Sequence, residues 1–132
     1  MKKIFFLLLC AVSLATTGYS QPGGFQRRTP EERTAAIHSK LDSAFKLEAS
    51  KLATLDTALL ALYKAQDKKR EELMSGGTMP DREIIMAEMK KFSDARDEML
   101  KAVLTEEQFG IWKEKIEPSM RPQRPPGSGS NR

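Results

Sequence analysis

From Thr29 to about Pro118, apolar residues recur at the three- and four-residue spacing of amphipathic helices. Breaks in this pattern occur at Lys46-Leu47, in the segment SGGTMPD, and at Leu104. No run shows the two-residue alternation of a strand. We therefore expect an all-α fold of four antiparallel helices, two of them long. Their expected bounds are Pro30 to the joint at Lys46-Leu47, about 48–74, about 80–103, and Thr105 to just before Pro118.

Each expected helix has one narrow apolar stripe, and Arg96 interrupts the stripe of the third helix. Such a stripe is the face that a helix buries against its neighbours. We interpret the stripes of the second, third and fourth helices as a seam for helix packing or for a dimer. In chain order, the stripe residues are Ile37, Leu41 and Phe45, then Leu52, Leu55, Leu59 and Leu62, then Ile85, Met89, Phe92, Met99 and Val103, and finally Phe109, Trp112 and Ile116.

Two segments have the form of a capping box, Thr29 to Glu32 and Thr105 to Gln108. In this motif the threonine accepts a hydrogen bond from the backbone three residues later, and the Glu or Gln side chain bonds back to the threonine N–H. Leu104 and Phe109 flank the second box at the spacing of a hydrophobic staple, which fixes the entry angle of the chain. We expect the last helix to fold back onto the long helices at this joint.

The first residues have the layout of a secretory signal peptide: a basic start, an apolar run from Ile4 to Ala15, and small residues before Gln21. The end of the chain is rich in Pro, Gly, Ser and Arg and has little apolar surface to bury. We therefore expect a periplasmic or otherwise exported protein. Its expected parts are a signal peptide at 1–20, a flexible lead at 21–28, a helical domain at 29–118 and a disordered tail at 119–132.

Removal of residues 1–20 lowers the formal charge from +4 to +2, because Lys2 and Lys3 leave and no acidic residue does. It also removes Cys10, the only cysteine, so no disulfide is expected. The remaining charges of both signs are interspersed, which does not fit a nucleic-acid binder. The chain has no phosphate-binding loop of the Walker type. We expect no cofactor, no nucleic acid and no membrane span.

The two long helices pose a packing problem, since their stripes are only one or two side chains wide. A module of this size without disulfides is marginal as a monomer. A second copy related by a two-fold axis would cover the flanks of the stripes. We therefore expect a thin, curved helical layer completed by homodimerisation.

The motif Leu104, Thr105, Gln108 in an exported, helical chain of this size resembles the Spy/CpxP family of envelope stress proteins, which carry Leu-Thr-x-x-Gln motifs. The segment Leu47 to Lys51 stands where that family has its first motif. Leu47 matches, whereas Glu48 replaces the Thr and Lys51 replaces the Gln. The resemblance implies a cradle-shaped dimer whose concave face binds unfolded proteins without ATP.

Candidate chemistry is sparse, and we expect binding rather than catalysis. His38, the only histidine, has Asp42 one turn later but no pocket or oxyanion hole predicted by the sequence. It is at most a weak candidate metal ligand. Met86 lies off the third stripe and is a candidate contact for clients, because methionine suits promiscuous binding surfaces. The leading expectation is a chaperone or stress adaptor; the alternatives are a metal-responsive sensor or metal-buffering protein and a passive helical scaffold.

Overall fold

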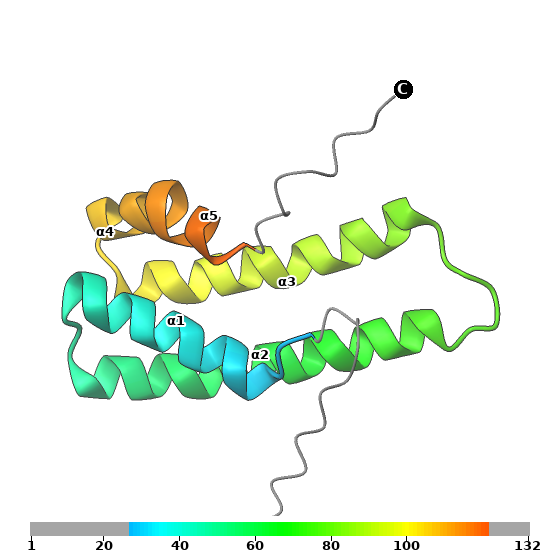
Figure 1. The fold of residues 1–132 in the computed structure, drawn as a ribbon, viewed down its shortest axis with the longest axis horizontal. Coiled ribbons are helices and arrows are strands. Elements are labelled where there is room, and N and C mark those ends of the chain that lie inside the picture. Colours follow the sequence, from blue (N-terminus) through cyan, green and yellow to red (C-terminus); the bar gives the residue numbers. More distant parts are fainter. Residues whose placement is uncertain (1–26, 122–132) are drawn as a thin grey trace, which may run out of the picture.

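The computed structural model describes residues 27–121, and this part of the chain is all-helical with no strand. The last three elements follow one another without a break, so the fold has four helical segments in chain order (Figure 1). The expected all-α class is thus confirmed. The elements are α1 Pro30–Phe45, α2 Ala49–Met74, α3 Arg82–Val103, α4 Glu106–Ile111, the π-helix η1 Trp112–Ile116, and α5 Glu117–Met120.

The two long helices, α2 and α3, lie side by side and are joined by residues 75–81 (Figure 1). The short helix α1 rests on the first half of α2, and α4 turns back at the end of α3. Helical segments therefore crowd at one end of the molecule, which we call the bundle: α1, residues 49–59 and residues 100–120. The rest of α2 and α3 with their loop, residues 60–99, forms what we call the arm.

Of the residues that the structure describes, all the fully buried ones belong to the bundle. None of residues 60–99 is fully buried. Each of the four helical segments contributes to one apolar cluster, so the bundle has a shared core and the arm does not. The buried apolar residues of the cluster are Ile37, Leu41, Leu52, Leu55, Leu59, Leu100, Leu104, Trp112 and Ile116.

Both expected capping boxes form. The Thr29 hydroxyl accepts from the N–H of Glu32 at 3.2 Å, and the Glu32 carboxylate accepts from the N–H of Thr29 at 2.8 Å. At the start of α4 the Thr105 hydroxyl accepts from the N–H of Gln108 at 3.2 Å, and the Gln108 amide oxygen accepts from the N–H of Thr105 at 3.0 Å. Leu104, directly before the second box, is buried. The chain thus turns from α3 into α4 at a joint with both polar and apolar anchors.

The joint between α1 and α2 has a different construction. Lys46 ends α1 in the left-handed conformation at φ 50°, and its N–H donates to the carbonyl of Asp42. Glu48 precedes α2 without any hydrogen bond from its side chain to the helix. Leu47 packs against the core, whereas Lys51 is exposed. The segment Leu47 to Lys51, with Glu48 at the N-cap position, therefore forms no capping box.

Two expected helix bounds were wrong. Helix α3 begins at Arg82, not near Pro80, with Asp81 at the N-cap position. The last helical segment does not end before Pro118 but continues to Met120. The π-helical turn of η1 ends two residues before this proline. A wider turn accommodates Pro118 because its ring would clash with the carbonyl four residues earlier in a regular α-helix.

The expected signal peptide at 1–20 lies outside the described residues, as do most of the lead at 21–28 and most of the tail at 119–132. Arg27 and Arg28 have no regular secondary structure, and Ser119 and Met120 belong to α5. No helix within residues 27–121 is both long enough and apolar enough to cross a lipid bilayer.

The cap at the α3–α4 joint predicts a measurable stability difference. Replacing Thr105 by Ala removes the acceptor for the Gln108 N–H, and we expect the free energy of unfolding to fall by about 1 kcal/mol. Thr57→Ala is the matched control, because the Thr57 hydroxyl only donates to the Ala53 carbonyl within α2. Urea denaturation followed by circular dichroism measures both. Equal losses in the two variants would contradict a capping role for Thr105.

Candidate functional site

The predicted seam separates into two zones. Leu52, Leu55 and Leu59 on α2 are buried in the bundle core, whereas Leu62 is half-buried. The predicted stripe of α3 is half-buried along its whole length, at Ile85, Met89, Phe92, Met99 and Val103. The one fully buried residue of α3 is Leu100, which the stripe did not include. Leu100 lies four residues before Leu104 and eight after Phe92, and this helical spacing is the feature of the sequence that indicates its burial.

The predicted face of the last helical segment does turn toward the core. Trp112 is 1% exposed and Ile116 is 9% exposed, while Phe109 is half-buried against the cluster. Truncation of a buried Trp to Ala typically costs about 3–5 kcal/mol, against about 1 kcal/mol for a cap. Trp112 therefore contributes more to the fold-back than the cap does.

Four charged side chains hold this segment on α3. Arg96 donates to Asp97 and to Glu117, each at 2.7 Å. Lys113 completes the group, at 2.9 Å from Asp97 and 2.6 Å from Glu117. The Arg96 guanidinium also lies 5.8 Å from the ring centroid of Trp112. Arg96 interrupts the apolar stripe in the sequence, and its partner Glu117 lies on the fold-back segment. We call these four residues the ionic clamp.

The clamp shifts the pKa values of its members. Burial raises the pKa of Asp97, but hydrogen bonds from Lys113 and Arg96 outweigh it, so the net pKa is lowered from 3.8. The same balance of burial against Lys113 and Arg96 lowers the pKa of Glu117 from 4.5. Hydrogen bonds to Glu117 and Asp97 raise the pKa of Lys113. The carboxylates are thus held in their charged form, which suits a structural clamp rather than acid–base chemistry.

Apolar side chains are left in solvent near the loop between the long helices. We call the group of Met74, Met79, Ile84 and Met86 the arm tip. Met79 is 79% exposed and Met86 is 61% exposed, and the other two are about half exposed. Met86 was the predicted client contact and is exposed as that role requires; Ile84 was missed because its neighbour Ile85 occupies the stripe. This is the largest set of exposed apolar side chains in the described chain.

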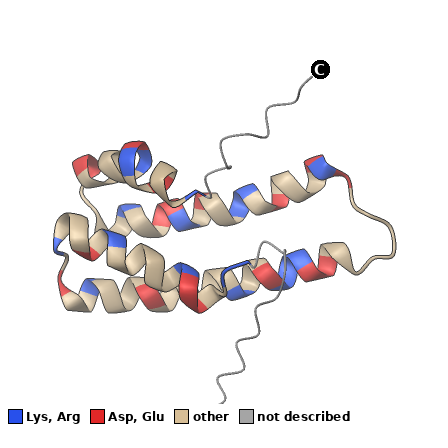
Figure 2. Cartoon of the chain, viewed as in Figure 1, with Lys and Arg blue, Asp and Glu red and all other residues tan. Residues whose placement is uncertain are grey.

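Charged residues surround the arm rather than forming a face of one sign. Lys and Arg alternate with Asp and Glu along both long helices (Figure 2). Several form pairs within one helix, such as Lys90 with Asp94 and Lys91 with Glu88, each at 2.6 Å. Exposed pairs of this kind contribute little to stability. They surround the apolar tip with solvated charges of both signs.

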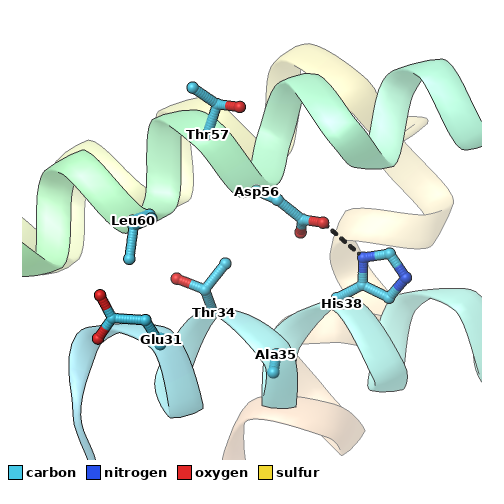
Figure 3. A pocket seen from close by; sticks show the side chains of 7 residues that line it. All are labelled: Glu31, Thr34, Ala35, His38, Asp56, Thr57 and Leu60. Atoms are coloured by element: carbon cyan, nitrogen blue, oxygen red, sulfur yellow. Dashed lines mark hydrogen bonds and ion pairs between the residues drawn. The ribbon is translucent and has the colours of Figure 1, made fainter.

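His38 lies in a shallow pocket between α1 and α2 (Figure 3). Its Nδ1 is 2.7 Å from a carboxylate oxygen of Asp56, so its partner is on α2 and not the Asp42 one turn away in sequence. Within residues 27–121 no group of three or more His, Cys, Asp or Glu side chains could hold a metal ion. Among the described residues, His38 is therefore paired with one carboxylate, and no third candidate ligand completes a group. The pocket is lined by Glu31, Thr34, Ala35, His38, Asp56, Thr57 and Leu60.

Comparisons with protein-family models, with curated proteins and with solved structures gave no match to this chain. The likeness to the Spy/CpxP family stays a prediction from the motif at Leu104 to Gln108 and from the order of the helices.

The ionic clamp predicts a loss of stability in acid. Its two carboxyls have lower pKa values in the folded protein than when unfolded, so their contribution is complete above about pH 5 and is lost as pH falls through the folded values. We expect the free energy of unfolding to fall between about pH 5 and pH 2. Asp97→Asn should be less stable than the parent at pH 7 and should differ from it less in acid.

Asp94→Asn is the control for this measurement, since Asp94 forms only the exposed pair with Lys90. Urea denaturation at a series of pH values compares the three proteins. A difference between Asp97→Asn and the parent that is constant with pH would contradict the clamp.

Proposed function

We propose that this protein is an exported chaperone or stress adaptor that binds unfolded segments of other proteins reversibly and without a nucleotide. The observation that carries the proposal is the arm: no residue from 60 to 99 is fully buried, and its tip exposes Met74, Met79, Ile84 and Met86. Apolar groups gathered on the surface typically mark a binding site.

The chemistry of the arm tip suits clients of varied sequence. Methionine is unbranched and polarisable, so three methionines adapt to side chains of different shape. Unfolded chains differ from folded ones in exposing apolar side chains, which are what this surface can cover. The charged residues around the tip (Figure 2) keep the apolar area narrow, which favours weak and reversible contacts over tight ones.

The sequence features agree with this proposal. The chain begins with a segment that resembles a signal peptide, and the α3–α4 joint carries the Leu-Thr-x-x-Gln motif of the Spy/CpxP family. The capping box at Thr105 and Gln108 gives that motif a physical role, since it sets the direction of the fold-back. In the proposal, this joint holds the bundle together and so supports the base of the arm.

For the assembly, we propose that α2 and α3 run antiparallel and that two chains pair along their arms. Ile85, Met89 and Phe92 are only half-buried within one chain, and a second copy would cover what remains exposed. Such an interface should bury more than about 1,000 Å² in total to be stable. The arm tips then lie beyond the paired stripes and remain open to clients.

The chaperone proposal predicts that the protein slows aggregation of a chemically denatured substrate, measured by light scattering at equimolar concentration without nucleotide. Replacing Met74, Met79, Ile84 and Met86 together by Gln should remove most of this effect, because the exposed apolar area disappears. Replacing the same four residues by Leu should preserve it.

Circular dichroism establishes that both variants keep the parental helix content. A Gln variant as active as the parent would place the binding surface elsewhere. An inactive parent would overturn the proposed function itself.

The dimer proposal predicts twice the monomer mass in sedimentation equilibrium at micromolar concentration. Ile85→Glu combined with Met89→Glu should shift the protein to monomer, because two charges would enter the paired stripe. Met79→Glu, at the exposed tip, is the matched control and should remain dimeric. A parental protein with monomer mass and full helical circular dichroism would rule the assembly out.

A further inference from the structure

A second concave site lies where the bundle meets the arm, away from the arm tip. It is a cleft of about 920 Å³ between α1 and the last helical segment, with one wall residue each from α2 and α3. This volume is at the upper end of the range for sites that hold small ligands, about 300–1,000 Å³. None of the four arm-tip residues lines it.

The inner part of this cleft is apolar. Ile37 and Trp112 line it and are themselves almost fully buried. Tyr63, Ala36 and Met120 line it and are half-buried. Burial raises the pKa of the Tyr63 hydroxyl despite the positive charges of Arg96 and Arg33 nearby, so this residue too is shielded from water. A ligand that fills the inner part must therefore offer an apolar body.

Positive charge dominates the same cleft. Among the described residues that line it, only Glu117 is acidic, and the ionic clamp already neutralises its charge. Within residues 27–121, Lys40 and Arg121 are exposed and form no ion pair, so their charges remain available at the rim. A ligand that binds in this cleft should therefore carry negative charge. The lining cations are Arg27, Arg28, Arg33, Lys40, Arg96 and Arg121.

Two lining residues also have buried N–H donors that find no partner among residues 27–121. These are the Nε of Arg33 and the Nε1 of Trp112. The other nitrogens of Arg33 bind Gln66 at 2.8 Å and Asp67 at 2.5 Å, which fixes its guanidinium 4.6 Å from the ring centroid of Tyr63. Arg and Trp side chains can donate but not accept. Both atoms are shielded from solvent, so their partial positive charge lies behind the cleft wall, where it favours an anionic ligand without a direct contact.

We propose that this cleft binds an anionic amphiphile, a molecule with one apolar chain and a carboxylate or phosphate head. The chain occupies the inner part against Ile37 and Trp112, and the head meets the rim cations. An inorganic anion would leave the apolar part wet, and a neutral amphiphile would leave the cations without a partner. This inference does not rest on the chaperone proposal, since it concerns a different surface and a different class of ligand.

Trp112 provides the readout, because it is the only tryptophan of the chain and lines the cleft. Dodecanoate and dodecyl phosphate, each added below its micelle concentration at low salt, should change the Trp112 fluorescence in a saturable way. Whichever of the two binds more tightly identifies the head group. The affinity for carboxylates should rise about fourfold per added methylene, from octanoate to dodecanoate, as burial of the chain requires.

Lys40→Glu with Arg121→Glu should weaken binding at least tenfold, since two attractive charges become repulsive. Lys51→Glu with Lys68→Glu is the matched control, because these exposed lysines do not line the cleft. Equal weakening in both variants, equal binding of dodecyl maltoside or dodecylammonium, or tighter binding of an acidic peptide would each overturn the proposal. Lys40→Gln with Arg121→Gln tests the same point without added negative charge.

Discussion

The Trp112 indole lies in the cluster to which all four helical segments contribute, and its burial joins them into one structure. Without it, α2 and α3 would be two long helices sharing a narrow line of contact. Two features of the chain hold the indole in place, a helix cap close to it and an ion pair between residues far apart in sequence. The Thr105 cap acts locally and sets the direction of α4, whereas the clamp from Arg96 to Glu117 fixes the far end of the segment.

This arrangement divides the molecule into parts of unequal stability. Segments with few buried contacts open with lower free energy than those with a shared core. Within residues 27–121 every fully buried residue is in the bundle, and the side chains of the arm are half-buried or exposed. The bundle thus provides a rigid base, while the arm combines exposed methionines with fewer restraints. A surface that accommodates many partners needs this conformational freedom. A cleft whose N–H donors are held in place, such as the one beside Trp112, needs a rigid frame.

Much of the fold could be predicted because helix starts and faces are local properties. The capping boxes at Thr29 and Thr105 follow from residues three positions apart, and the burial of Leu55 and Leu59 follows from spacing along one helix. What the sequence did not reveal depends on residues far apart in the chain. In the sequence, Arg96 only interrupts the apolar stripe of its helix. Its partner Glu117 is 21 positions away, so local spacing does not reveal the ion pair.

The same reason explains the misjudged details of the candidate sites. His38 has an acidic neighbour one turn away in sequence, yet it bonds to Asp56 across the helix pair. Ile84 and Ile85 are adjacent, so only one can lie in the stripe, and periodicity alone does not say how exposed the other becomes.

The π-helical turn before Pro118 also changes the direction in which the side chains after it point. Each residue of an α-helix advances the direction of its side chain by about 100°. A π-turn takes in an extra residue and so sets back the phase of all that follows. Glu117 follows η1 and lies toward Arg96, and shortening the segment by one residue would rotate it away from this partner.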